Sequence, residues 1–164
     1  MLTGLTLERD PQVIQKTIGE LNGLACRLEW VAEAAGVKFY NDSKATNVDA
    51  AVRAIKSFER PLVLIAGGRH KGAEYAPLVM AAEGRVRSVV LLGEAKELLA
   101  KAFEGTVPFS SAESMEEAVS TAFSQTISGD VVLLSPACSS FDMFTDYSHR
   151  GQVFRAAVER LVNG

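Results

Sequence analysis

The sequence is short of cysteine, of excess charge and of long apolar runs. Its two cysteines, Cys26 and Cys138, lie far apart in 164 residues, which fits a reducing compartment better than a disulfide framework. The net charge of -3 gives no reason to expect nucleic acid or an anionic membrane as a partner. No apolar run approaches the roughly 20 residues that span a bilayer, and no charged-then-apolar signal segment opens the chain. We therefore expect a soluble, cytoplasmic protein.

Several familiar motifs of catalytic and metal sites are also missing. The glycine-rich stretch 67–72 is not a nucleotide P-loop, because Ala73 follows it where Lys and Ser/Thr would stand, and it lacks the G-x-G-x-x-G spacing of dinucleotide-binding loops. The hydrolase motif G-x-S-x-G is absent. Neither His70 nor His149 forms a metal-ligand cluster with Cys138. We expect Cys138 to be a small buried residue and expect no metal ligand in this chain.

The sequence does contain a regular alternation of apolar runs and helical patterns. Hydrophobic residues make up 48% of the chain, enough for one domain with its own core. Continuous apolar runs predict strands buried on both faces of a parallel sheet, and helical spacing predicts helices between them. The alternation implies βαβ units with right-handed crossovers, and thus an α/β fold. The buried strands are expected at 61–66, 86–92 and 131–134, and the helices at 48–58, around 78–82, and at 95–103, 114–127 and 151–162.

Two further features complete the predicted architecture. Residues 28–31 and 37–40 flank a turn at 34–36 and predict a hairpin, which a short helix over 10–21 precedes. Residues 107–109 predict a short edge strand, because Pro108 cannot donate to a ladder.

Three polar or glycine-rich loops, 41–47, 67–72 and 135–142, follow the carboxyl ends of predicted strands. Ligands of open α/β sheets bind outside those ends, so we expect the three loops to share one rim. The first loop, Asn-Asp-Ser-Lys-Ala-Thr-Asn, is typical of a strand-to-helix turn with capping residues. Its N–H groups would face an anion. A capped turn explains every residue of it except Lys44, and a solvated lysine on such a turn is the alternative.

The other two loops also allow two interpretations. Lys71 alone would be a solvated loop lysine, but beside Lys44 it favours a paired cationic site for carboxylate or phosphate. Residues 139–147 offer serine hydroxyls and an aromatic floor from Phe141, Phe144 or Tyr147, or else a capping turn with core aromatics.

Taken together, the three loops resemble the Mur ligase family. The matching segments are Asp42-Ser43-Lys44-Ala45-Thr46-Asn47, Gly67-Gly68-x-x-Lys71-Gly72, and Leu134-Ser135-Pro136-Ala137-Cys138-x-Ser140-Phe141-Asp142-x-Phe144 with Arg150-Gly151 behind it. Order and spacing resemble most the C-terminal domain of the members that add D-glutamate to UDP-N-acetylmuramoyl-L-alanine for peptidoglycan synthesis. The resemblance implies that 24–164 is this amino-acid-binding domain, with a Rossmann-like three-layer αβα fold. Residues 1–23 would then be the tail of a central ATPase domain or a linker.

In the family, ATP phosphorylates the substrate carboxylate and the amine of D-glutamate attacks the acyl phosphate. The resemblance implies that Lys44 and Thr46 lie nearest the reacting phosphate and are the catalytic residues. It also implies that Arg27, Asp42 and Lys44 contact the nucleotide. Spacing alone would make Arg27 an ordinary surface arginine. Magnesium ions would be held mainly by the family's central domain. Neither that central domain nor the family's N-terminal domain has a counterpart in this sequence. The domain alone would be inactive, because the site is assembled by domain closure.

The same resemblance assigns the carboxylates of D-glutamate to a second group of residues, namely Lys71, Thr46, Ser140, Phe141 and Tyr147. Two positions depart from the family pattern. Arg69-His70 stands where an acidic residue is frequent, and Tyr147 replaces a phenylalanine. The alternative to an enzyme domain is a non-catalytic α/β module that binds a small anion at the same rim.

Overall fold

The computed structural model describes residues 25–164, so the helix expected over 10–21 lies outside the described residues. Six strands form one sheet in the order β1-β2-β6-β3-β4-β5. Neighbouring strands from β2 to β5 are parallel, whereas β1 is antiparallel to β2. The strands are β1 Glu29–Ala34, β2 Val37–Asn41, β3 Leu62–Gly67, β4 Val86–Leu92, β5 Phe109–Ala112 and β6 Val131–Ala137. The helices are α3 Val48–Lys56, α4 Ala76–Ala82, α5 Lys96–Phe103, α6 Met115–Ser124 and α7 Tyr147–Asn163.

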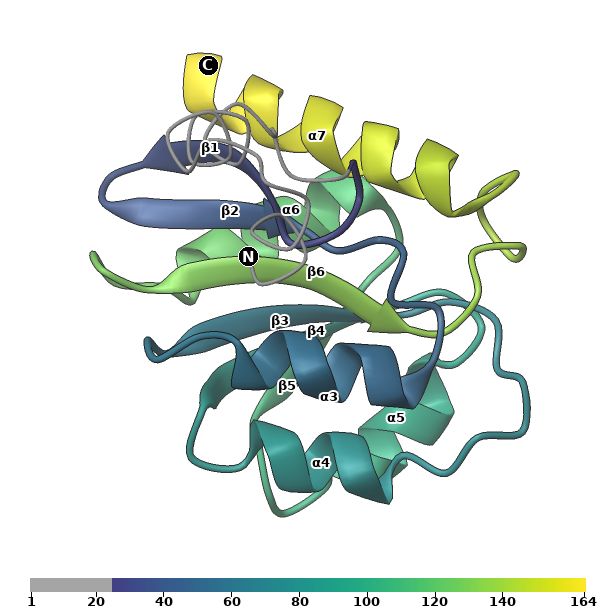
Figure 1. The fold of residues 1–164 in the computed structure, drawn as a ribbon. Helices are drawn as coiled ribbons and strands as arrows, with labels where there is room; N and C mark the ends of the chain where they lie inside the picture. The colour runs from purple at the N-terminus through teal and green to yellow at the C-terminus, as the bar shows by residue number, and fades with distance from the viewer. Residues whose placement is uncertain (1–24) are drawn as a thin grey trace, which may run out of the picture.

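Helices cover both faces of the sheet, which confirms the predicted three-layer α/β fold (Figure 1). One core lies between the sheet and α3, α4 and α5, and the other lies between the sheet and α6 and α7. Every residue of β3 and of β6 is buried, as continuous apolar runs in a doubly covered parallel sheet require. The predicted hairpin is confirmed as β1 and β2, with Ala35 and Gly36 at positive φ in the turn between them.

Several predicted element boundaries were wrong. Helix α7 begins at Tyr147 rather than at 151, because the Asp146 carboxylate caps it by accepting from the N–H of His149 at 2.7 Å. Helix α6 ends at Ser124 rather than 127. Strand β6 continues through Pro136 to Ala137 rather than stopping at 134. Strand β5 is an edge strand as predicted, but it begins at Phe109.

Within residues 25–164, no helix combines the length and the apolar character needed to cross a membrane.

Candidate functional site

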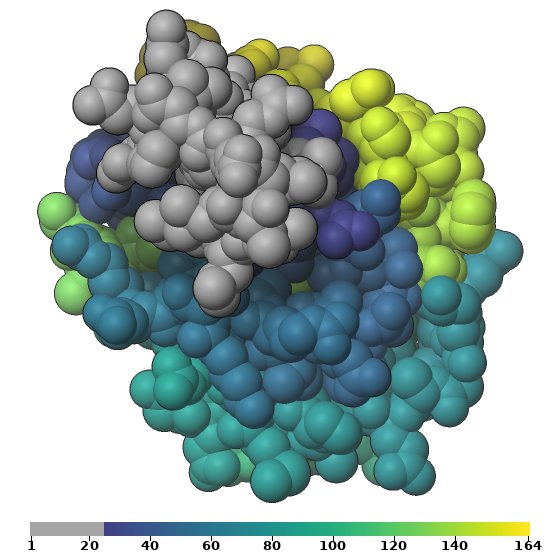
Figure 2. Space-filling view, in the orientation of Figure 1, coloured from purple at the N-terminus to yellow at the C-terminus, as the bar shows by residue number. Residues whose placement is uncertain are grey.

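The carboxyl ends of β2, β6 and β3 lie side by side, because β6 pairs with β2 on one edge and with β3 on the other. The loops after these strands therefore meet at one rim, on the right in Figure 1. Backbone bonds join the second and third loops, from Arg69 N–H to the Ser139 carbonyl at 2.9 Å and in return at 3.3 Å. Figure 2 shows the yellow-green start of α7 and the loop before it seated beside the blue and teal loops. The predicted convergence of the three loops is confirmed.

Arg150, in the first turn of α7, connects the first and third loops. Its guanidinium donates to the Ser43 hydroxyl at 3.0 Å, to the Ser43 carbonyl at 2.9 Å and to the Cys138 carbonyl at 3.2 Å. Only 2% of this side chain is exposed. Burial lowers the pKa of Arg150 to about 10, so the side chain remains charged at neutral pH. It holds the first loop against the third.

The prediction from sequence used Arg150 only as part of a motif and gave it no role. The helix was expected to begin after it, so its inward position was not foreseen. Asp146, an N-cap residue followed by helix-compatible residues, was the signal that could have placed Arg150 in the first turn of α7.

The close approach of the loops depends on Gly68. This residue has φ +130°, and a Cβ on it would lie 2.2 Å from the Ser139 carbonyl oxygen and 3.1 Å from Nη1 of Arg150. Ala137, at the end of β6, also has a positive φ of 59°, a conformation that is uncommon outside glycine. The contact between the second and third loops therefore depends on these unusual backbone conformations.

The first loop caps α3 as predicted. The Asn47 side chain accepts from the N–H of Ala50 at 2.9 Å, and the Asn41 side chain accepts from the N–H of Ser43 at 3.1 Å. Lys44 is exposed, and its Nζ lies 5.2 Å from the centre of the Tyr147 ring, within the range of a cation–π contact.

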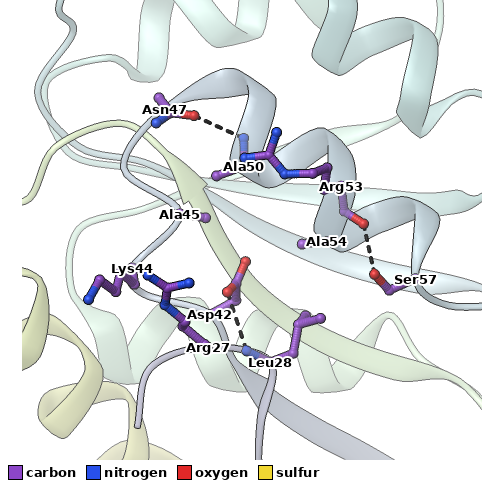
Figure 3. A pocket seen from close by; sticks show the side chains of 10 residues that line it. All are labelled: Arg27, Leu28, Asp42, Lys44, Ala45, Asn47, Ala50, Arg53, Ala54 and Ser57. Carbon is purple, nitrogen blue, oxygen red and sulfur yellow. Dashed lines mark hydrogen bonds between the residues drawn. The ribbon is translucent and has the colours of Figure 1, made fainter. Parts of the chain in front are cut away.

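Beside this loop is an open cavity of about 390 Å³ (Figure 3). All three predicted nucleotide contacts, Arg27, Asp42 and Lys44, line this cavity. The described residues that line it are Arg27, Leu28, Asp42, Lys44, Ala45, Asn47, Ala50, Arg53, Ala54 and Ser57.

The Asp42 carboxylate is held in place at the cavity wall. It accepts from the Ser135 hydroxyl at 2.9 Å and from the N–H of Leu28 at 3.3 Å. Burial raises the pKa of Asp42, and these two hydrogen bonds and the charge of Arg27 only partly oppose that rise. A carboxylate at this position is therefore oriented, and its negative charge is partly desolvated.

The raised pKa of Asp42 predicts a pH effect on stability. The protonated form of Asp42 is favoured by folding, so its stabilising contribution is complete below the ordinary pKa of 3.8 and is lost as the pH rises through the higher folded pKa. The variant Asp42→Asn carries no such charge. We expect its free energy of unfolding, relative to that of the parent chain, to increase as the pH is raised from about 4 to 7. Urea unfolding of both proteins across this range measures the difference; a constant or falling difference would contradict it.

The second loop presents Lys71 to solvent, while its neighbours are engaged. Arg69 binds Glu94 through two bonds of 3.1 and 3.0 Å, so a carboxylate offsets the basic departure from the family pattern. His70 Nδ1 lies 2.9 Å from the Tyr75 hydroxyl, which in turn lies 3.2 Å from Cys138 Sγ. Burial raises the pKa of the Cys138 thiol, and the hydrogen bond with Tyr75 and the charges of Arg150 and Lys71 only partly oppose that rise. The expectation of a buried Cys138 is confirmed at 2% exposure.

The predicted substrate contacts in and after the third loop differ in exposure, since one is buried and two are exposed. Ser140 is 1% exposed, and its carbonyl accepts from the N–H of Phe144 at 2.9 Å. Phe141 is 61% exposed and Tyr147 is 36% exposed, whereas Phe144 packs against the core under α6 and α7. Of the expected aromatic floor, then, Phe141 and Tyr147 are available at the surface.

Thr46 completes the predicted set. It is partly buried in the first loop, and its N–H donates to the Lys44 carbonyl at 2.8 Å. Among residues 25–164, no three His, Cys, Asp or Glu side chains are grouped so as to hold a metal ion.

Comparison with known proteins gives a consistent family match. Residues 26–138 match the family described as "Mur ligase, glutamate ligase domain". The UDP-N-acetylmuramoylalanine--D-glutamate ligase of Geobacter metallireducens is 49% identical over 160 residues, which is 98% of this chain and 35% of that protein. The ligase of the same name from Caldicellulosiruptor saccharolyticus is 44% identical over 159 residues, 96% of this chain and 35% of that protein. The chain thus spans about a third of the length of these relatives.

Solved structures share the fold at low sequence identity. The bifunctional folylpolyglutamate synthase/dihydrofolate synthase of Yersinia pestis has a TM-score of 0.65 and 17% identity, over 92% of this chain and 34% of that one. A domain from a putative UDP-N-acetylmuramate:L-alanyl-gamma-D-glutamyl-medo-diaminopimelate ligase of Haemophilus ducreyi has a TM-score of 0.58 and 15% identity, over 84% of this chain and 98% of that one. The second structure is of a separate domain.

Proposed function

We propose that this chain, which belongs to the Mur ligase family through its glutamate ligase domain, is the D-glutamate-binding domain of an ATP-dependent ligase. That ligase would join D-glutamate to UDP-N-acetylmuramoyl-L-alanine, a step of peptidoglycan precursor synthesis. Residues 24–164 would form its C-terminal domain, and 1–23 the end of its central domain or a linker. The single observation that carries the proposal is identity of 44–49% along almost the whole chain to two ligases named for D-glutamate.

The rim has the charges that this reaction requires. Formation of an acyl phosphate and attack by an amine both gather negative charge on phosphate and carboxyl oxygens, which fixed cations and N–H donors stabilise. Lys44 would lie nearest the reacting phosphate, with Thr46 beside it. The exposed ammonium of Lys71 would bind a carboxylate of D-glutamate as a charge-assisted contact. Ser140 and the exposed Phe141 and Tyr147 would complete the amino-acid site.

On the other side of Lys44, the cavity along α3 fits a nucleotide. Arg27 supplies positive charge at its edge and Asp42 supplies an oriented carboxylate, which accepts hydrogen bonds well from ribose hydroxyls. Magnesium would be held mainly by the central domain of the ligase. ATP supplies the phosphoryl group that activates the carboxylate, and this chain binds and orients the reactants.

The alternative is a small-anion-binding module without catalysis. It would use the same rim, but a scaffold for one anion does not require Lys44 and Lys71 on separate loops together with a nucleotide-sized cavity. We therefore favour the ligase domain.

The test is a chimeric ligase, in which this chain replaces the matching third of the Geobacter metallireducens enzyme. We expect ATP- and UDP-N-acetylmuramoyl-L-alanine-dependent phosphate release with D-glutamate and at least about 100-fold less with L-glutamate, because a site with two fixed carboxylate contacts discriminates between enantiomers. A folded chimera that uses both enantiomers equally, or neither, would contradict the proposal. The unaltered Geobacter enzyme is the control.

A further inference from the structure

The cavity beside the first loop extends beyond the residues assigned to the nucleotide. It follows α3 from Asn47 at the N-cap to Ser57 at the C-cap, and Arg53 lies in this extension. Figure 3 shows Arg53 across the cavity from Arg27 and Lys44, with Asp42 beside Arg27. Neither the loop motifs nor the predicted site residues include Arg53.

The charges around the cavity favour an anion. Three cations line it, namely Arg27, Lys44 and Arg53, and Asp42 is the one acidic residue among its described lining residues. Both oxygens of Asp42 already accept hydrogen bonds. Within the part of the chain described, no carboxylate forms an ion pair with any of the three cations. Cations gathered around one cavity repel each other, and a multiply charged anion between them removes that cost.

The remaining lining explains why the anion would be part of a larger molecule. The side chains of Leu28, Ala45, Ala50 and Ala54 give the cavity an apolar wall, which a free phosphate ion does not need. A cavity with cations at its edge and a small apolar wall suits a nucleoside phosphate, whose anionic chain and uncharged nucleoside are joined.

We propose that Arg53 is a further nucleotide-binding residue, which contacts the phosphate chain of ATP from α3, opposite Arg27 and Lys44. This inference rests on the proposed function, since it takes the ligand to be the ATP of the ligase reaction. The guanidinium offers a planar set of donors matched to phosphate oxygens, which an ammonium does not. Arg53 is exposed on a helix whose N-cap is fixed by Asn47, so it is positioned without being buried.

The test uses the chimeric ligase with Arg53→Ala. Loss of one charge-assisted contact is expected to raise KM for ATP about tenfold, with kcat and KM for D-glutamate within about twofold because Arg53 does not reach the reacting atoms. Inhibition by ADP should weaken by the same factor, while inhibition by adenosine should not change. KM for ATP of Arg53→Lys should lie between those of the parent chimera and of Arg53→Ala, because lysine retains the charge and loses the planar donors.

Lys56→Ala is the matched control. Lys56 lies on the same helix, is exposed and carries the same charge, but it does not line the cavity. An unchanged KM for ATP in Arg53→Ala would overturn the inference while leaving the ligase proposal intact. Equal weakening of adenosine and ADP would overturn the phosphate assignment. If Lys56→Ala raised KM for ATP as much as Arg53→Ala does, the change would come from long-range charge alone, and a direct contact between Arg53 and the phosphates would be refuted. A parent chimera without activity would instead refute the proposed function.

Discussion

Replacing Lys44 by alanine is expected to lower kcat of the chimeric ligase by about 100- to 1,000-fold, the loss typical when a fixed group that stabilises transition-state charge is removed. Lys44 is the exposed cation of the first loop, and the main chain around it is fixed by the bond from its N–H to the Cys26 carbonyl at 3.0 Å. An alanine here would keep the loop and remove only the charge. Initial rates of phosphate release, with all three substrates at saturation, measure the effect.

Lys38→Ala supplies the comparison for this loss. Lys38 is also exposed and lies in β2, near the opposite end of the strand from the first loop. Its removal is expected to leave kcat within about twofold, since exposed charges distant from the reacting atoms are screened. Turnover of Lys44→Ala equal to that of Lys38→Ala would refute the catalytic role of Lys44.

Arg150→Met is expected to lower the free energy of unfolding of the isolated chain by about 3 kcal/mol, because hydrogen bonds made by a charged group contribute roughly 1.5–3 kcal/mol each. Methionine fills much of the volume but leaves the carbonyls of Ser43 and Cys138 without their donor. Burying the arginine charge has its own cost, so the net loss is smaller than the sum of the three bonds. Urea denaturation followed by far-UV circular dichroism gives the value.

Arg160→Met on the same helix is the control. The Arg160 side chain is 71% exposed and pairs with Glu116 at the surface, so this change should cost no more than about 0.5 kcal/mol. A loss for Arg150→Met as small as that of Arg160→Met would show that Arg150 does not hold the loops together.

The sequence was informative where a local pattern decides the structure. The apolar runs of β3 and β4 mark buried strands because a parallel sheet covered on both faces excludes water along its whole length. Capping residues were recognisable in the first loop because a short polar side chain before a helical pattern satisfies free N–H groups, and Asn47 is the residue that caps α3. The meeting of the three loops followed from topology, since the ends of neighbouring parallel strands lie at the same edge.

The sequence was less informative where long-range packing decides the structure. The buried position of Arg150 depends on carbonyls of Ser43 and Cys138, which are 107 and 12 residues away in the chain. Pairing of Arg69 with Glu94 depends on the path of β3 and β4. The cavity that includes Arg53 arises from the packing of α3 beside the first loop, and no spacing in the sequence shows it.

Mapping the binding of D-glutamate on the isolated chain by ¹⁵N–¹H NMR tests most directly whether the three loops form one amino-acid site. Titration with D-glutamate should shift the amide signals of Thr46, Lys71 and Phe141 together, with a single dissociation constant, and L-glutamate should shift them far less. Shifts confined to one loop, or the same response to both enantiomers, would contradict a shared D-glutamate site at this rim.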